Sequence, residues 1–283
     1  MLPILIWLAS YPKSGNTWLR SIISSLINTD DGNFNFKLLD RIPLFPMRKH
    51  LQNFTKNFNN FEEVQKYWLI AQEKINLSKK INFFKTHQLN CNINNFEFTN
   101  NNNTAAAIYI VRDPRNLITS ISNHYDKSIE ESKKFLFTPR LIGTEPAENN
   151  VINLIGSWNE HYNFWTKSDL FKNKILIIKY EDLILNIEKQ IEKMITFLNR
   201  YISVSADKNK IKKIIETTSF GNLQKMEENE NFKEGVYDNT KSKKVKFFFR
   251  GPENNWKVSL AEKDIKEIET KFYPEMKELG YIK

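Results

Sequence analysis

Cysteine is almost missing from this chain of 283 residues, because Cys91 is the only one. A single thiol rules out an internal disulfide and a thiolate metal cluster, and it suits a reducing cytosol. The four histidines are scattered, without the HxxxH or HxH spacing typical of a metal site. We therefore expect a cytoplasmic protein that binds no metal.

Long hydrophobic runs are missing as well. No apolar run reaches the ~18 residues that a membrane span needs, so we expect no span. The apolar start, "MLPILIWLAS", lacks a basic n-region and a small-residue cleavage site, and we interpret it as a core strand instead of a signal peptide. With 40% hydrophobic and 27% charged residues, and no repeat or linker, the chain is expected to form one globular domain over residues 1–283.

The charge is unbalanced toward the positive sign. A net charge of +9 points to an anionic partner, which could be nucleic acid, an anionic surface or a phosphorylated small molecule. A lysine-rich solvated surface would give the same number. Charge alone does not choose among these readings.

Short apolar runs rich in β-branched and aromatic residues predict the strands. They cover residues 3–10, 81–87, 105–112 and 174–181. Helical patterns lie between these runs, so we predict an α/β fold with a central parallel sheet flanked by helices. Ligands of such sheets bind beyond the carboxyl ends of the strands. The asparagine-rich residues 90–103 are expected to form a loop, and "SLAE" (259–262) resembles a capping box that opens a last helix.

The first strand is followed by "YPKSGNTW" (11–18), a lysine and small residues placed before a helical pattern. Free N–H groups at a helix start attract anions, and Lys13 adds a full positive charge beside them. The stretch predicts a P-loop-like site for phosphate or sulfate. It is not a Walker A motif, because its lysine precedes the glycine. The alternative is an ordinary turn with Asn16 or Thr17 as the N-cap.

"YPKSGNTW" resembles the 5′-phosphosulfate loop of the cytosolic-type sulfotransferases, which use 3′-phosphoadenosine 5′-phosphosulfate (PAPS). Their loop usually reads YPKSGTTW, so Asn16 replaces a threonine. The resemblance implies a donor site made by the residues of this loop from the lysine to the tryptophan: Lys13, Ser14, Gly15, Asn16, Thr17 and Trp18.

"FFKTH" (83–87) resembles the family segment that carries the catalytic histidine, which implies His87 as the base. A histidine at a strand's carboxyl end suits this role, because its unperturbed pKa lies near neutrality. Lys85 lies two residues earlier and therefore on the same face of the strand. The plainer interpretation of His87 is a strand-end histidine that bonds to backbone.

"YIVRDPRNLITSISNHY" (109–125) places Arg112 and Ser120 at the spacing with which the family holds the 3′-phosphate. Guanidinium matches phosphate bidentately, and a hydroxyl adds a further bond. Asp113 or its neighbour is expected to cap the next helix, with Pro114 at its first position. A surface salt bridge is the alternative role for Arg112.

Three later segments complete the resemblance. "YEDL" implies Tyr180 near the adenine, and "TTSF" (217–220) implies Thr218 and Phe220 on the base, with Trp18 on its other face. "FFFRGPENNWK" (247–257) resembles the segment that closes over the 3′-phosphate, which implies Arg250 and Gly251. This last match departs from the family pattern in three places. The basic and aromatic residues 241–250, which overlap its start, could instead bind nucleic acid.

The resemblance implies transfer of a sulfuryl group from PAPS to a hydroxyl or amine, leaving 3′-phosphoadenosine 5′-phosphate (PAP). His87 would take the acceptor proton, and Lys13 and Lys85 would stabilise charge, without a metal. The alternatives are a kinase or NTPase with an atypical phosphate loop, a nucleic-acid-binding module, and a sulfotransferase fold without activity. The family's dimer motif KxxxTVxxxE is missing, so nothing follows about oligomeric state.

The acceptor is expected to be a small alcohol, phenol or lipid-like molecule, and we expect no nucleic acid partner. The expectation rests on aromatic residues that could wall an apolar pocket, together with residues 125–150. These aromatic residues are Phe34, Phe36, Phe45, Phe54 and Phe58.

Overall fold

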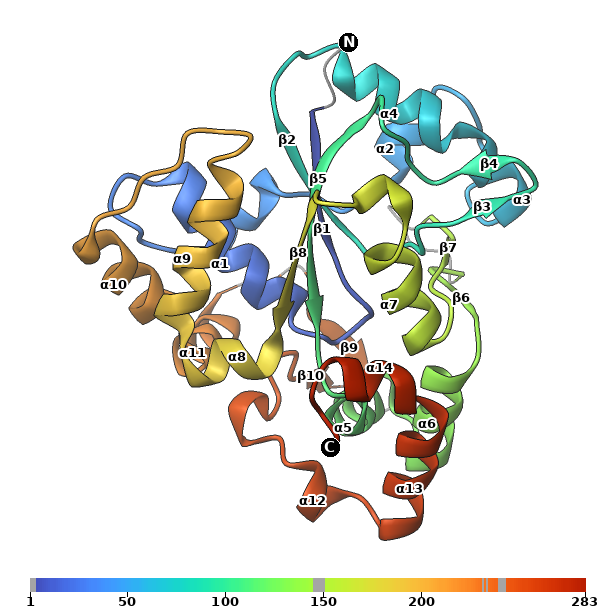
Figure 1. Ribbon diagram of the computed structural model, residues 1–283, viewed down its shortest axis with the longest axis vertical. Helices are drawn as coiled ribbons and strands as arrows, with labels where there is room; N and C mark the ends of the chain where they lie inside the picture. The colour runs from blue at the N-terminus through green and yellow to red at the C-terminus, as the bar shows by residue number, and fades with distance from the viewer. Residues whose placement is uncertain (1–3, 145–150, 231, 233, 239–242) are drawn as a thin grey trace.

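A four-stranded parallel sheet forms the centre of the molecule in a computed structural model that describes residues 4–144, 151–230, 232, 234–238 and 243–283 (Figure 1). Its strands are β1 (Leu5–Ala9), β2 (Asn82–Thr86), β5 (Thr104–Val111) and β8 (Ile175–Lys179). They lie in the order β2-β1-β5-β8, and each neighbouring pair is parallel. All four predicted strands are confirmed, and with them the α/β fold class.

The strands that follow β1 in the sequence lie on both sides of it, β2 on one side and β5 on the other. From β1 the chain crosses to β2 on one side, and it then returns to β5 on the other side of β1. Loops that leave two adjacent strands at such a switch point diverge and open a crevice. The β1–α1 loop (residues 11–15) and the residues after β5 border this crevice.

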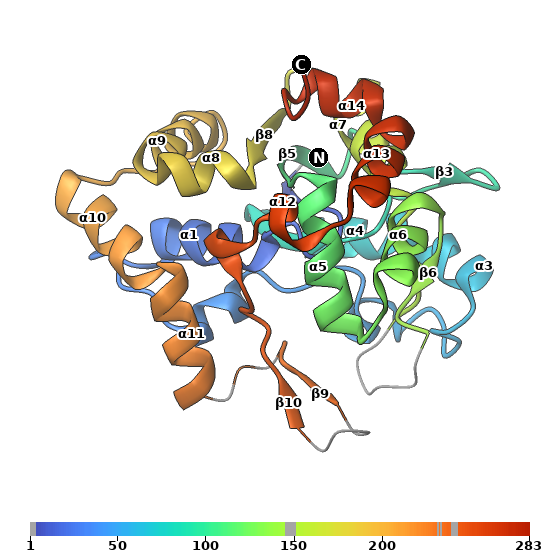
Figure 2. The same ribbon diagram turned by 90° about the horizontal axis from the view of Figure 1, so that it is seen from below.

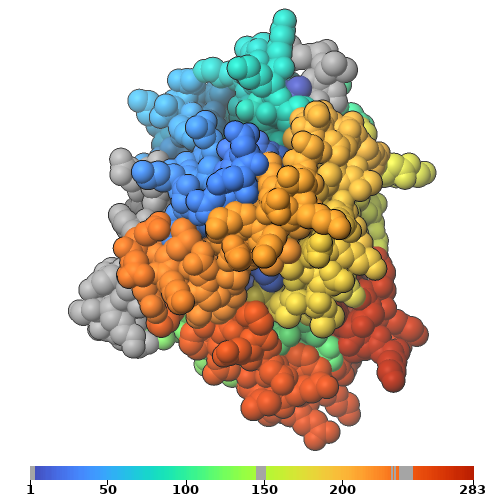
Figure 3. Space-filling view, turned by 90° about the vertical axis from the view of Figure 1, so that its left-hand side faces the viewer, coloured from blue at the N-terminus to red at the C-terminus, as the bar shows by residue number. Residues whose placement is uncertain are grey.

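One face of the sheet packs against the N-terminal helix and a run of later helices. They are α1 (Asn16–Asn28), α8 (Tyr180–Leu185), α9 (Ile187–Leu198), α10 (Lys208–Thr217) and α11 (Phe220–Asn229). Ile6, Leu8 and Ile108 point into this half of the core. Figure 3 shows the yellow to orange segments lying beside the blue N-terminal segment on this side.

The opposite face carries the remaining long helices. They are α4 (Trp68–Asn76), α5 (Pro114–Tyr125), α6 (Ile129–Phe137), α7 (Trp158–Thr166), α13 (Glu262–Lys271) and α14 (Tyr273–Glu278). Trp7, Tyr109 and Val111 point into this half of the core, alternating with the residues that face the other half. Among the helices of the described residues, none combines the length and the apolarity that a membrane crossing requires.

Short elements surround this frame. They are α2 (Arg48–Leu51), α3 (Phe61–Val64), α12 (Trp256–Ser259), the 3₁₀ turns η1 (Phe36–Arg41), η2 (Gln65–Tyr67), η3 (Asp169–Phe171) and η4 (Gly251–Glu253), and the strand pairs β3 (Asn92–Ile93)–β4 (Phe96–Glu97), β6 (Leu141–Ile142)–β7 (Asn153–Leu154) and β9 (Val236–Asp238)–β10 (Lys243–Val245). Viewed from the carboxyl ends of the strands, β9 and β10 project beside α11 (Figure 2).

Two local predictions need correction. The segment 90–103 is not only a loop, because Asn94 and Asn95 take positive φ angles of 53° and 66° and join β3 to β4. Asparagine tolerates this conformation better than most residues. The capping box at 259–262 does not form, since Ser259 ends α12 and Ala261 is the N-cap of α13.

The start of α5 agrees with the prediction. Asp113 is its N-cap and accepts a hydrogen bond from the N–H of Arg115, and Pro114 stands at the first helical position. This start turns α5 beneath the carboxyl ends of the strands, where its side chains face the crevice.

Candidate functional site

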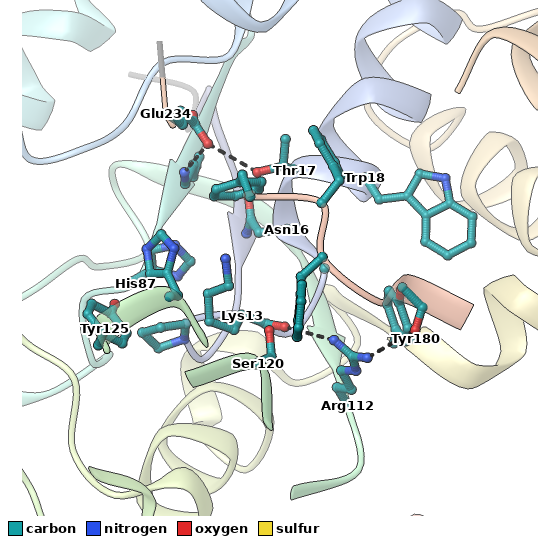
Figure 4. Close-up of a pocket in the computed structure, with 18 of the residues that line it drawn as sticks. Lys13, Asn16, Thr17, Trp18, His87, Arg112, Ser120, Tyr125, Tyr180 and Glu234 are labelled. Atoms are coloured by element: carbon teal, nitrogen blue, oxygen red, sulfur yellow. Dashed lines mark hydrogen bonds and ion pairs between the residues drawn. The ribbon is translucent and has the colours of Figure 1, made fainter. Parts of the chain in front are cut away.

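A cavity of about 500 Å³ lies at the carboxyl ends of the strands. The β1–α1 loop, the ends of β2 and β5, helix α5 and the segment 247–251 all contribute side chains to it. Figure 4 shows Lys13, His87 and Tyr125 on one side of it, with Arg112 and Tyr180 on the other. Most of the predicted site residues therefore share a single cavity, although they are scattered along the chain.

The β1–α1 loop wraps its backbone around one end of the cavity. Gly15 has a φ of 99°, and a Cβ there would collide with the ring of Tyr180. Only glycine satisfies both conditions at low cost. Helix α1 begins directly afterwards at Asn16, so its first N–H groups have no partner within the helix and face the cavity end. Gly15, and neither Asn16 nor Thr17, is therefore the N-cap.

The side chain of Asn16 is tied back to the preceding strand instead of facing a ligand. Its Nδ2 donates to the carbonyl oxygen of Leu8 at 2.9 Å and to the hydroxyl of Ser10 at 3.1 Å. Ser14 is fully buried and its side chain does not line the cavity. The N–H of Ser14 already donates to the carbonyl oxygen of Tyr11 at 3.3 Å, whereas its Oγ is buried without a hydrogen-bond partner. Asn16 shapes the loop through its side chain and can offer an anion its backbone N–H, since it is the first residue of α1.

Lys13 brings its charge to the middle of the cavity from a left-handed conformation, with a φ of 67°. Its Nζ lies 3.8 Å from the centre of the Phe247 ring, a cation–π contact. Burial, followed by the charges of Lys85 and Arg112, lowers the pKa of Lys13 to about 7. An anion placed here would favour the charged form of the lysine.

His87 is held with one ring nitrogen bonded and the other free for chemistry. Its Nδ1 lies 2.8 Å from the carbonyl oxygen of Ser10, which can only accept, so Nδ1 carries the proton. Nε2 is then unprotonated, and the ring lines the cavity. Burial, and next the charge of Lys85, lowers the pKa of His87 to about 3, so the imidazole is neutral near pH 7.

A second, buried histidine supports the backbone of His87. His161 lies on α7, and its Nε2 donates to the carbonyl oxygen of His87 at 3.1 Å. Its Nδ1 lies 2.8 Å from the hydroxyl of Tyr109, which donates to it. Because His161 is fully buried and neutral, it serves as a support in the core and does not touch the cavity.

Arg112 connects the two sides of the cavity. Its guanidinium donates to the carbonyl oxygens of Lys13 and Gly251, each at 3.4 Å, and stacks on Tyr180 at 4.1 Å. Its Nε is buried without a hydrogen-bond partner. Buried donors are normally satisfied, so this nitrogen fits an anionic ligand. Ser120 lines the same part of the cavity from α5.

The residues predicted to contact the adenine divide into those that line the cavity and one that does not. Trp18, Tyr180 and Phe220 all line the cavity, and the rings of Trp18 and Tyr180 meet edge-on at 5.4 Å. Thr218 does not line it, because this residue is fully buried and its hydroxyl donates to the carbonyl oxygen of Ile214 at 2.7 Å. The predicted contact of the Thr218 side chain with a ligand is therefore corrected.

The segment 247–251 covers the cavity and is held by α11. Glu227 accepts hydrogen bonds from the N–H groups of Phe247 and Phe248 at 2.7 and 3.0 Å. Gly251 has a φ of 50° and touches Phe220 so closely that a Cβ would collide with the ring. Arg250 lines the cavity and donates to the Ser259 hydroxyl at 3.1 Å.

Several polar residues that line the cavity were not predicted from the sequence, among them His124 and Glu234. His124 follows Ser120 by four residues on α5, so the helical repeat could have identified it. Burial, followed by the charges of Lys13 and Lys85, lowers the pKa of His124 to about 3. Glu234 gave no sequence signal, because its partners Arg20 and Lys85 are distant along the chain.

The cavity also has apolar lining residues. Its wall includes Leu44, Tyr125, Ile142, Val151 and Phe247. The five phenylalanines expected there, Phe34, Phe36, Phe45, Phe54 and Phe58, do not line the cavity; they pack in or against the core. The expectation for residues 125–150 holds for Tyr125, Ile142 and Gly143, while residues 145–150 lie outside the described part of the chain.

Among the described residues, one group of three acidic side chains lies close enough together to hold a cation. Glu130, Asp264 and Glu267 surround the ammonium of Lys133, with N···O distances of 2.6 to 2.8 Å. The lysine already supplies the positive charge. This cluster lies outside the cavity.

The fold and the cavity together define an α/β protein with a P-loop-like anion site and a histidine beside it. The chain matches the family model described as "Sulfotransferase domain" over residues 3–280, and it therefore belongs to this family. The predicted family is confirmed.

The identity to individual relatives is low. The chain is 24% identical to cytosolic sulfotransferase 15 of Arabidopsis thaliana, covering 92% of this chain and 68% of the relative. It is 23% identical to flavonol 3-sulfotransferase of Flaveria bidentis, covering 93% and 79%. The aligned part of the chain covers about two thirds of the length of three Arabidopsis relatives, namely 64% to 68%.

A solved structure has the same fold. The crystal structure of mouse sulfotransferase SULT7A1 complexed with PAP aligns with a TM-score of 0.60 at 20% identity, covering 97% of this chain and 85% of the mouse chain. At this identity the likeness concerns the fold alone.

Proposed function

We propose that this chain transfers the sulfuryl group of PAPS to a hydroxyl of a small apolar acceptor, with His87 as the general base. The observation that carries the proposal is that one cavity contains both the β1–α1 loop and His87, whose Nε2 is free to accept a proton. Family membership supports the reaction type. One domain, a cytoplasmic location and independence of metal stay predictions.

The donor would lie along the switch point between β1 and β5. Lys13 and the first N–H groups of α1 suit its 5′-phosphosulfate end, since they combine a cation with unpaired donors. Arg112, with its unpartnered Nε, and Ser120 suit the 3′-phosphate. Trp18, Tyr180 and Phe220 offer aromatic surface to the adenine.

The reaction follows from this placement. His87 Nε2 takes the proton of the acceptor hydroxyl as its oxygen attacks sulfur, and the bond between sulfur and the bridging oxygen of the 5′-phosphate breaks. Lys13 and the loop N–H groups stabilise the negative charge that grows on that oxygen. Such preorganised donors each contribute about 3–4 kcal/mol in comparable sites.

The acceptor is proposed to be an alcohol, phenol or lipid-like molecule. The cavity lining includes apolar side chains such as Leu44, Ile142 and Val151 besides its polar groups. The flavonol relative, by its name, acts on a phenolic compound. A phenol or alcohol buried here would present its oxygen to His87.

The test is an assay with sulfur-labelled PAPS and a panel of phenols and alcohols in chelator-treated buffer. We expect label transfer to at least one acceptor and release of PAP. A second arm supplies γ-labelled ATP with Mg²⁺ and the same acceptors. Phosphoryl transfer in that arm, with none from PAPS, would instead identify a kinase.

Replacing Arg112 with alanine is expected to weaken PAP binding roughly 10- to 100-fold, the value of a charge-assisted hydrogen bond to phosphate. AMP, which lacks the 3′-phosphate, should lose much less affinity. Isothermal titration of both nucleotides measures the difference, with Arg200→Ala on the exposed surface as the control. Equal losses for PAP and AMP would contradict the assignment of Arg112 to the 3′-phosphate.

Nucleotide binding is expected to take up a proton above about pH 7. The pKa of Lys13 is about 7 in the free protein, and a bound phosphate would raise it. Below pH 7 the lysine is charged in both states, whereas above it binding must restore the proton, so PAP affinity falls as the pH rises.

Titration calorimetry in two buffers of different ionisation enthalpy measures this uptake. Lys13→Arg stays charged throughout and should bind PAP without the uptake. An uptake of the same size in Lys13→Arg would show that another group titrates.

A further inference from the structure

A half-buried carboxylate lies among the cations of the cavity. Glu234 Oε1 lies 2.6 Å from Nη1 of Arg20, and its Oε2 lies 3.0 Å from Nζ of Lys85 and 3.1 Å from the hydroxyl of Thr17. Figure 4 shows the side chain pointing at Thr17. One carboxylate thus contacts both α1 and β2.

Phe232, two residues before Glu234, anchors this segment in the core. Phe232 is buried, and its ring packs against Phe36 at 4.7 Å and Phe247 at 5.1 Å. The carbonyl oxygen of Phe232 accepts a hydrogen bond from the N–H of Gly235 at 3.1 Å. Glu234 lines the cavity, where its carboxylate forms the ion pairs with Arg20 and Lys85.

The charges around Lys85 explain why a carboxylate is needed there. The described residues that line the cavity include the cations Lys13, Lys85, Arg112 and Arg250, and Glu234 is the only carboxylate among them. Lys85 is only 12% exposed, and Arg20 adds another positive charge behind it. Without Glu234, a nearly buried ammonium would face like charges and no counterion.

We propose that Glu234 is the positioning residue for Lys85, and that its carboxylate holds the Lys85 ammonium between the β1–α1 loop and His87. The catalytic value of this position rests on the proposed function: in that reaction Lys85, which the family resemblance implies as a charge-stabilising residue, would donate to the transferred sulfonate. An ammonium has three donors, so Lys85 keeps its bond to Glu234 while it donates to the ligand.

The protonation state of Lys85 gives the proposal a measurable consequence. Burial lowers the pKa of Lys85, and the charge of Glu234 opposes this effect. Lys13, Arg20, His87 and His124 also surround the ammonium, and none of them supplies negative charge. Removing the carboxylate therefore shifts Lys85 toward its neutral form as the pH rises.

The first experiment compares wild type, E234Q and E230Q by their pH profiles of sulfuryl transfer. Glu230 is exposed and provides the matched removal of one charge. We expect the kcat of E234Q to fall further below that of wild type as the pH rises, and to approach it at acidic pH, where Lys85 keeps its proton without the carboxylate. PAP binding is compared at that acidic pH, because Glu234 also raises the pKa of Lys13. E230Q should match wild type throughout.

A second substitution at Lys85 tests whether the effect of E234Q comes from the charge of Lys85 or from side-chain packing. In the double variant E234Q/K85R the guanidinium cannot lose its proton, so the alkaline loss should disappear. If E234Q does not fold, E234D replaces it, because its shorter side chain cannot reach both Arg20 and Lys85. An E234Q enzyme with an unchanged kcat and pH profile overturns the proposal. Tighter PAP binding and faster turnover in E234Q also overturn it, since Glu234 would then compete with the donor.

A second measurement does not depend on activity. The ε-carbon signal of Lys85, assigned by its loss in Lys85→Arg, is followed by NMR against pH in wild type and E234Q. We expect a lower pKa of Lys85 in E234Q, and an unchanged pKa would contradict the proposal. If wild type transfers no sulfuryl group, the proposed function fails, and this titration still decides whether Glu234 controls Lys85.

Discussion

His87→Ala is expected to lower kcat for sulfuryl transfer about 10²–10⁴-fold, the usual value of a positioned general base. The loss follows from the geometry, because Nδ1 is committed to Ser10 and Nε2 is the nitrogen that remains for the acceptor proton. PAP affinity should change little, since the donor contacts come from the β1–α1 loop and from Arg112. Steady-state rates with PAPS and a phenolic acceptor, together with PAP titration, measure both quantities.

A control for this prediction is His50→Gln. His50 is also an imidazole, but it lies outside the cavity, where its Nδ1 accepts a hydrogen bond from the N–H of Met47. Its replacement should leave kcat unchanged. Full turnover in His87→Ala would contradict the assignment and would direct attention to His124, the other histidine that lines the cavity.

Lys13→Ala is expected to lower kcat/KM for PAPS about 10²–10³-fold, as the loss of one donor aimed at developing charge does elsewhere. Lys13 reaches the middle of the cavity, and with the N–H groups of α1 it is the cation placed at the phosphosulfate end. Lys80→Ala, on the exposed surface, is the matched control. A change of less than about threefold in Lys13→Ala would contradict its role, because it corresponds to under about 0.7 kcal/mol.

The two variants should differ in what they lose. His87→Ala removes a group that acts on the acceptor, so its effect lies in kcat. Lys13→Ala also removes a contact with the donor, so PAP and PAPS affinity should fall as well. This split in kinetic behaviour distinguishes a base from an electrostatic donor without further structural information.

Features encoded by neighbouring residues could be predicted from the sequence. The four strands follow from apolar runs, and the start of α5 follows from Asp113 and Pro114. The turn between β1 and α1 follows from a glycine and a lysine placed between a strand and a helical pattern. In each case the deciding interactions are local, within a few residues of one another.

Features that depend on competing hydrogen bonds or on distant partners were missed or mistaken. Ser259 did not become an N-cap, because its hydroxyl bonds to the carbonyl oxygen of Asn255 and accepts from Arg250. Thr218 belongs to a matching segment, yet its hydroxyl bonds within α10. The ion pairs of Glu234 join segments more than a hundred residues apart, and no spacing rule predicts them.

The prediction that five phenylalanines line the acceptor pocket was wrong for a related reason. Phenylalanine is as suited to a core as to a ligand pocket, and composition does not tell which face of the chain points inward. Phe45 packs against Trp7 and Phe84 in the core, while its neighbour Leu44 lines the cavity. A shift of one residue along an extended segment reverses the direction of the side chain, so the sequence alone could not separate the two.

The most direct test of the account is a calorimetric titration of PAP into the protein, with AMP and Mg²⁺–ATP as comparisons. The account predicts one site that binds PAP more tightly than either comparison nucleotide, with the affinity reduced in both Lys13→Ala and Arg112→Ala. No binding of PAP, or tighter binding of Mg²⁺–ATP, would contradict it.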